Sequence, residues 1–284
     1  MFGKEKNKSI VDLAKEFDDG SISSQASNQP ESPADTSVPR STHISDQVGS
    51  LLENLKGVHD YVEFNLPSLG KPYENYNSEV IGIRPLRFSD EKNIQQHALG
   101  DRALDGLNLI LASCLQGPEY LELTLPDKLF ALFKLRQLSY GSEYPLESIC
   151  EKCSHKNQIK FELSSMEVNY LENSINEITN VYLPDSKKNA VVGILRTKDE
   201  SAMAEIKDVI HSLPSYVKSI EGISDINVIT LFLEGTTVKD VGIIRSAIFN
   251  PTYGIAQDSE YVCEKCMEKN DLTVSVNANF FSPS

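Results

Sequence analysis

The sequence lacks any apolar run long enough to cross a membrane, which takes about 18 or more consecutive apolar residues. Its first residues, Met1–Lys6, also lack the apolar segment that a secretory signal peptide requires. Both absences argue against an exported or membrane-spanning protein. We therefore expect a protein that acts in the cytoplasm of the cell that makes it.

Basic residues are scarce relative to acidic ones. The chain has 27 Lys and Arg against 41 Asp and Glu, which gives a formal net charge of −14. A surface this acidic repels phosphate backbones, and the sequence has no stripe of Lys or Arg with interleaved aromatic residues. The composition therefore favours protein partners, and we expect no binding to nucleic acid.

Recognisable catalytic motifs are absent as well. The sequence contains no P-loop, no G-x-G-x-x-G, no H-E-x-x-H and no G-x-S-x-G. Five scattered histidines are more typical of surface or structural positions than of catalytic bases: His43, His59, His97, His155 and His211. We expect no enzymatic activity, although a pair of catalytic carboxylates far apart in sequence, as in a cell-wall hydrolase, stays open.

Four of the five cysteines lie in two identical Cys-Glu-Lys-Cys tetrapeptides, Cys150–Cys153 and Cys263–Cys266. The match extends beyond the cysteines to a preceding Tyr-Gly and a following Lys-Asn, and every matched position is offset by 113 residues. A two-residue spacer lets both thiolates of a tight turn face one tetrahedral zinc, and two such turns complete a four-sulfur site. We therefore predict one structural zinc, with its ligand shell filled by Cys150, Cys153, Cys263 and Cys266.

Two alternatives stay open for these cysteines: a redox or disulfide pair, and thiols without a ligand. A redox C-x-x-C usually opens a helix after a strand. Here each tetrapeptide is followed by alternating residues that read as strand, Gln158–Leu163 and Asp271–Val276, so zinc-knuckle hairpins are favoured. His155 is at most a substitute or outer-shell ligand, and Cys114 reads as a small buried hydrophobe on a helix.

Residues 1–46 read as a mostly disordered arm. The stretch Ser21–Asp46 is rich in Ser, Pro, Gln, Asn and Asp and cannot bury enough apolar surface to fold. Before it, the pattern predicts a short amphipathic helix at 9–19, with Ile10, Leu13 and Phe17 on one face. Such a helix on a flexible tether either docks a partner protein or has no partner, and the pattern favours neither.

Beyond the arm, the pattern predicts an α+β fold of two similar lobes, residues 47–165 and 166–284, each ending in a C-x-x-C hairpin. The expected strands cover residues 61–66, 80–84, 179–184 and 191–194, and the clearest helices cover 107–115, 125–138, 225–232 and 237–249. The repeated order indicates an internal duplication with a period of roughly 110–117 residues. The shared zinc would then join the two lobes.

Three strings in the first lobe form an ordered set: Phe64–Tyr73, Ile81–Leu86 with Ser89-Asp90-Glu91, and Asp127-Lys128-Leu129 leading to Leu135–Gly141. With the C-x-x-C that follows, this set resembles the baseplate hub assembly protein family of T-even-type contractile-tailed bacteriophages. The resemblance covers residues 60–170 well and the second half more loosely. It rests mainly on the Leu-Pro-Ser-x-Gly-x-x-Tyr and Leu-Arg-x-x-Ser-Tyr-Gly strings.

The resemblance implies a non-enzymatic phage protein that helps to build the baseplate hub at the tip of the tail. Its partners would be other hub proteins, and the arm, which lies outside the resembling pattern, would dock them through Ile10, Leu13 and Phe17. It would act in the host cytoplasm during assembly or also stay in the virion baseplate. The runner-up function is a zinc-ribbon adaptor associated with nucleic-acid machinery, which salt-dependent nucleic-acid binding would reveal. Neither function sets an oligomeric state.

Overall fold

The computed structural model describes residues 60–98, 103–200, 209–276 and 278–281, all within one compact unit, Val58–Ser284. The predicted helix at 9–19, with Ile10, Leu13 and Phe17, lies outside the described residues. Within them the fold is mixed α and β, as predicted, and it contains several small antiparallel sheets. In the described ranges, no helix combines the length and the apolar character needed to span a bilayer.

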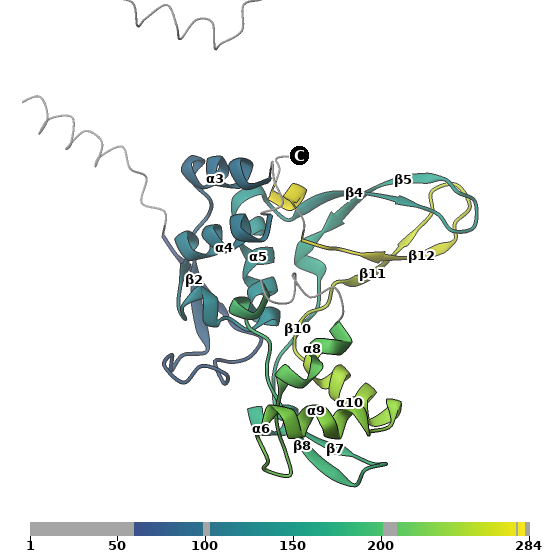
Figure 1. Cartoon of the computed structure of the whole chain (residues 1–284). Helices are drawn as coiled ribbons and strands as arrows, with labels where there is room; N and C mark the ends of the chain where they lie inside the picture. The colour runs from purple at the N-terminus through teal and green to yellow at the C-terminus, as the bar shows by residue number, and fades with distance from the viewer. Residues whose placement is uncertain (1–59, 99–102, 201–208, 277, 282–284) are drawn as a thin grey trace, which may run out of the picture. The chain divides into compact units, whose positions relative to one another are not determined.

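The first half starts with a three-stranded sheet in the order β1-β2-β3 and ends in a two-stranded hairpin (Figure 1). Its elements in chain order are β1 (Val62–Asn65), β2 (Val80–Ile83), α3 (Phe88–Ala98), α4 (Ala103–Cys114), β3 (Leu115–Gln116), the 3-10 helix η1 (Tyr120–Glu122), α5 (Leu125–Tyr140), β4 (Glu143–Ile149), β5 (Lys156–Glu162) and the 3-10 helix η2 (Leu163–Ser165). In the first sheet Val62 lies opposite Ile83, and in the hairpin Glu143 lies opposite Glu162.

The second half also has a three-stranded sheet, β7-β8-β9, and a terminal hairpin. Its elements are β6 (Val168–Asn169), α6 (Ile175–Thr179), β7 (Asn180–Leu183), β8 (Lys188–Val192), η3 (Thr197–Asp199), α8 (Val209–Tyr216), β9 (Val217–Ile220), α9 (Ile226–Glu234), α10 (Val238–Phe249), β10 (Gly254–Ile255), β11 (Asp258–Val262), β12 (Lys269–Thr273) and η4 (Ala278–Phe281). The short strand β10 pairs with β6 rather than with either hairpin.

Helices α5 and α10 begin in the same way and precede the two hairpins. Thr124 caps α5 by accepting a hydrogen bond from the backbone N–H of Asp127, and Thr237 caps α10 by accepting one from that of Asp240. Such a cap satisfies a backbone N–H that the helix itself leaves unpaired. The predicted helix at 237–249 is therefore confirmed, with Thr237 as its cap. Helix α9 stands between β9 and α10, whereas the described residues between β3 and α5 form only the 3-10 helix η1.

Two hydrophobic cores hold the described residues together. One core, between 181 and 248, consists of residues from the second sheet and the helices packed on it. The other combines the first half with residues from the C-terminal end of the chain: Ile255, Tyr261, Leu272, Val274, Phe280 and Phe281. The lobes predicted at 47–165 and 166–284 stay a prediction, but in packing the end of the chain joins the first core.

Backbone and side-chain hydrogen bonds also connect the start of α5 with the segment between β8 and η3. The N–H of Leu125 donates to the carbonyl of Leu195, and the N–H of Thr197 donates to the carbonyl of Leu123. Between these residues, the guanidinium of Arg196 donates to the carbonyls of Glu122, at 2.6 Å, and Pro72, at 2.8 Å. The two cores are thus joined near the N-terminus of α5.

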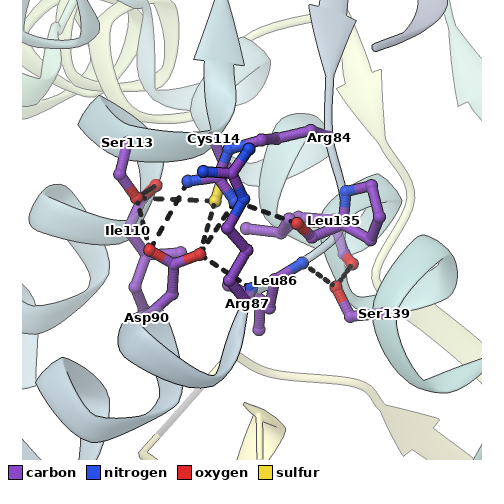
Figure 2. A network of polar contacts seen from close by, with 10 residues as sticks. Arg84, Leu86, Arg87, Asp90, Ile110, Ser113, Cys114, Leu135 and Ser139 are labelled. Carbon is purple, nitrogen blue, oxygen red and sulfur yellow. Dashed lines mark hydrogen bonds and ion pairs between the residues drawn. The ribbon is translucent and has the colours of Figure 1, made fainter. Parts of the chain in front are cut away.

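A buried ion pair fixes α3 against the first sheet (Figure 2). The Arg84 guanidinium lies 2.8 Å from the Asp90 carboxylate, and their side chains are only 7% and 6% exposed. Asp90 also accepts hydrogen bonds from the N–H of Arg87 and the hydroxyl of Ser113. Burial alone would raise the pKa of Asp90, but the hydrogen bonds from Arg84 and Arg87 outweigh it and lower that pKa. This carboxylate therefore stays ionised inside the fold.

The same region contains Cys114 and also Ser139, which belongs to the Leu-Arg-x-x-Ser-Tyr-Gly string. Cys114 is buried, as predicted, and its sulfur lies 3.7 Å from an Asp90 carboxylate oxygen (Figure 2). Burial raises the pKa of Cys114 to about 11. Ser139 donates to the carbonyl of Leu135 at 2.7 Å and accepts from the N–H of Leu86 at 2.9 Å. The Ser-Tyr-Gly and Arg-Pro-Leu strings thus meet in a partly buried contact.

Candidate metal centre

The structure brings the four cysteines of the two tetrapeptides together at the tips of the β4–β5 and β11–β12 hairpins, which run side by side (Figure 1). Their four sulfurs all lie within 4.8 Å of one another. Two sulfur pairs join the hairpins, Cys150 to Cys266 and Cys153 to Cys263, each at 3.6 Å. Tetrahedral zinc with bonds of about 2.3 Å needs sulfurs about 3.8 Å apart, so the donor set fits a metal of this type.

The two turns have the same backbone geometry. In the first, the N–H of Cys150 donates to the carbonyl of His155, and the N–H of Ser154 donates to the carbonyl of Cys150. In the second turn, the N–H of Cys263 donates to the carbonyl of Glu268, and the N–H of Met267 donates to the carbonyl of Cys263. The closing residues Ser154 and Met267 both have positive φ, 54° and 58°. The left-handed conformation is uncommon for such residues, which indicates that the turn shape is enforced by its surroundings.

Burial raises the pKa of the cysteine thiols, whereas hydrogen bonds from backbone N–H groups lower it. Burial opposes ionisation of Cys263, but the N–H groups of Lys265 and Cys266 outweigh it and lower its pKa to about 6. The pKa of Cys150 is lowered for the same reasons. The N–H of Glu268 lowers the pKa of Cys266, but burial and hydrogen bonds to the other three cysteines outweigh it and raise that pKa. A metal that takes all four thiolates therefore displaces a proton from Cys266.

Charges around the centre are mostly solvent-exposed. Lys152, inside the first tetrapeptide, pairs with Glu268 of the opposite hairpin, and both side chains are substantially exposed. Exposed ion pairs contribute about 0–1 kcal/mol, so this contact contributes little to stability. The imidazole of His155 is not part of the four-residue metal-binding cluster that the described residues form. The part of His155 that contacts the first turn is its backbone carbonyl, which accepts a hydrogen bond from the N–H of Cys150.

Sequence reasoning missed two buried asparagines beside the cysteines, Asn157 in β5 and Asn270 in β12. Each contacts the turn of the opposite hairpin. The available signal was the Lys-Asn pair that follows both tetrapeptides at the same spacing. A surface asparagine does not need to recur in this way, so the recurrence could have indicated a role at the centre.

A second group of motif residues meets away from the cysteines, around Asp127. Its carboxylate accepts hydrogen bonds from the N–H of Ser68 at 3.0 Å and from the hydroxyl of Tyr73 at 2.5 Å. The Tyr73 oxygen in turn accepts from the N–H of Thr124 at 3.1 Å. Burial raises the pKa of Asp127, although the hydrogen bonds from Ser68 and Tyr73 oppose it. The Leu-Pro-Ser-x-Gly-x-x-Tyr string therefore forms a structural network, which we call the Asp127 network, at the start of α5.

The equivalent aspartate of the second half has a similar role. Asp240 accepts hydrogen bonds from the N–H groups of Asp185, at 3.2 Å, and Ser186, at 2.8 Å. The hydroxyl of Ser186 adds a third bond at 2.7 Å. Each half therefore has a buried aspartate in the first turn of the helix that precedes its hairpin. This aspartate accepts hydrogen bonds from backbone N–H groups that follow the first strand of the three-stranded sheet.

A protein-family model matches residues 59–282, which is more than half of the chain and includes both cysteine hairpins. The family is described as T4 bacteriophage base plate protein. Neither the curated proteins nor the solved structures contain a significant match. The resemblance seen in the motifs is thus confirmed, and the chain belongs to the T4 bacteriophage base plate protein family.

Proposed function

We propose that this chain is a non-enzymatic assembly or scaffold protein of the phage tail baseplate hub and that it acts through contacts with other baseplate proteins. The family match over residues 59–282 carries the proposal. The net charge of −14 and the absence of recognisable catalytic motifs support a role in protein contacts. The chain would act in the host cytoplasm during assembly and have its place in the virion baseplate.

We further propose that Cys150, Cys153, Cys263 and Cys266 bind one structural zinc. The sulfur–sulfur distances of 3.6 Å between the hairpins support this assignment, because they match a tetrahedral four-sulfur site and exceed the length of a disulfide bond. Four thiolates complete the shell of the ion. Zinc held in this way would fix the hairpins to each other and would supply no chemistry to a substrate.

The likeness of the two halves supports an internal duplication with two lobes. The three-stranded sheets, the threonine-capped helices, the buried aspartates and the cysteine hairpins recur in the same order. Under this proposal the zinc-knuckle hairpins are equivalent parts of two repeats, and the metal lies between them. The first core would then be completed by the second repeat, since it includes residues 255–281.

The N-terminal arm is the proposed docking element. Its predicted helix would present Ile10, Leu13 and Phe17 to a hub protein, while the Ser- and Pro-rich stretch would serve as a tether. This arrangement leaves the folded part of the chain free to contact a second baseplate protein. The arm would bring both partners into proximity by raising their effective concentration.

A stop codon early in the gene tests the function directly. The mutant phage is expected to make no complete tails, and a plasmid that supplies the intact chain should restore them. Mass spectrometry of hub intermediates from infected cells should find the chain together with other baseplate proteins. A synonymous change at the same codon is the matched control. Complete tails in the mutant, with the chain absent from wild-type intermediates, would contradict the proposed function.

A further inference from the structure

Asn157 and Asn270 occupy equivalent positions in the two cysteine hairpins, and both are buried. Each lies four residues after the second cysteine of its turn, and their exposed fractions are 1% and 7%. A buried amide is costly unless its oxygen and its nitrogen both find hydrogen-bond partners. Both asparagines satisfy this requirement, and they do so with matching partners.

The amide oxygens reach across to the opposite hairpin. Oδ1 of Asn157 accepts a hydrogen bond from the N–H of Glu264 at 3.0 Å, and Oδ1 of Asn270 accepts one from the N–H of Glu151 at 3.0 Å. Glu151 and Glu264 directly follow the first cysteine of each turn. The two bonds are therefore reciprocal, and each joins one hairpin to the metal-binding turn of the other.

The amide nitrogens hold the asparagines to their own turns. Nδ2 of Asn157 donates to the carbonyl of His155 at 3.1 Å, and Nδ2 of Asn270 donates to the carbonyl of Glu268 at 2.9 Å. These carbonyls also accept the N–H of Cys150 and Cys263. Each asparagine thus links a backbone carbonyl of its own turn to a backbone N–H of the opposite turn.

The reciprocal bonds act on the metal-binding turns themselves. The N–H groups that the asparagine oxygens accept, those of Glu151 and Glu264, directly follow Cys150 and Cys263. The carbonyls that accept the asparagine Nδ2 groups also accept the N–H groups of these two cysteines. The positions of the cysteines and of the hairpins are therefore set by one connected network.

We propose that Asn157 and Asn270 are positioning residues that clasp the two hairpins and hold the four sulfurs in a binding arrangement before a metal arrives. The inference rests on the proposed metal site, and it adds a contribution of the protein that does not depend on the ion. Only a side chain with both an acceptor and a donor at this reach serves both turns. Aspartate would set a carboxylate oxygen against the carbonyl of His155 or Glu268 and add negative charge beside the thiolates.

The first test measures zinc affinity in the full chain by competition with a chromophoric chelator. Asn157→Ala and Asn270→Ala are each expected to bind zinc about 10–100-fold more weakly, the usual effect of losing an outer-shell partner. Gln158→Ala and Asp271→Ala are the matched controls, because these exposed residues lie next to the asparagines in the same strands. Both controls should keep the wild-type affinity. Asn157→Asp keeps the volume and the acceptor, and it should also weaken binding.

The second test needs no metal. Chelator-treated full chain is oxidised with diamide, and tryptic cleavage after Lys152 and Lys265 separates the two cysteines of each turn, so that the pairing can be mapped. Wild type is expected to form mainly the inter-hairpin disulfides Cys150–Cys266 and Cys153–Cys263. The asparagine variants should shift to pairs within one turn, while Gln158→Ala keeps the wild-type pattern.

The two tests separate the clasp from the zinc assignment. A purified chain that binds no zinc but shows asparagine-dependent inter-hairpin pairing would overturn the proposed zinc and support the clasp. Alanine variants that keep both the wild-type affinity and the wild-type disulfide pattern would overturn the clasp and leave the zinc site standing. If circular dichroism shows that an alanine variant does not fold, Asn157→Asp takes its place in the comparison with wild type.

Discussion

Cys263→Ser is expected to release the metal and to destabilise both halves of the molecule together. Structural zinc contributes about 10–16 kcal/mol in small peptide sites at neutral pH, whereas a whole domain is stable by only about 5–15 kcal/mol. Closing a loop of about 100 residues costs on the order of 4–5 kcal/mol of chain entropy. The metal contribution exceeds this cost, so removing one ligand should remove most of the stability of the paired hairpins.

The packing of the hairpins explains why the effect should spread. Tyr144 and Phe161 from one hairpin and Tyr261 and Leu272 from the other belong to the same core. Hairpins that separate at their tips would therefore expose apolar surface at their bases as well. Hydrogen exchange followed by mass spectrometry should show faster exchange in β2, which belongs to the first half, and in β8, which belongs to the second.

Cys114→Ser is the matched control, since it changes the fifth cysteine, which lies away from the cluster, beside Asp90. A serine hydroxyl can still donate to this carboxylate, so the control should keep its metal and most of its stability. A metal-free Cys263→Ser protein in which β2 keeps wild-type protection would contradict the idea that the metal holds the halves together.

Asp127→Ala is expected to destabilise the fold although it changes none of the cysteines. The change leaves the buried N–H of Ser68 and the hydroxyl of Tyr73 without their acceptor. Each buried group left unpaired costs about 1–3 kcal/mol, so the free energy of unfolding should fall by roughly 2–6 kcal/mol. Urea unfolding followed by far-UV circular dichroism measures this loss.

Two further variants bracket the Asp127 prediction. Asp127→Asn keeps one oxygen acceptor and should lose less stability than the alanine variant. Asp105→Ala removes an exposed aspartate from the first turn of α4, where only a favourable contribution of about 0.3–1 kcal/mol from the helix dipole is at stake. Equal losses in Asp127→Ala and Asp105→Ala would show that the Asp127 network has no structural role.

Local patterns predicted the elements that local rules govern. Alternating residues after each tetrapeptide indicated strands, and the structure has β5 and β12 there. Helical periodicity indicated the helices that became α5 and α10, and the threonine that precedes α10 is its cap. The four cysteines could be grouped from sequence because a C-x-x-C spacing fixes the turn, and an exact repeat suggests a shared site.

Contacts between distant segments could not be read in this way. Strand β3 has only two residues, too few for a recognisable alternation. Phe280 packs against Phe133 and Tyr144, with ring centroids 4.9 and 5.1 Å apart, although about half of the chain separates them from it. The role of Asn157 depends on the backbone of the opposite hairpin, which spacing along one strand does not encode.

The most direct test of the account is the metal content of the full-length chain purified without added metal or chelator. Elemental analysis should find one zinc per chain, and X-ray absorption should find four sulfur neighbours at about 2.3 Å. No zinc would contradict the shared centre. Two zinc ions per chain, or a shell with nitrogen or oxygen ligands, would show that the hairpins bind metal separately and that no single ion joins them.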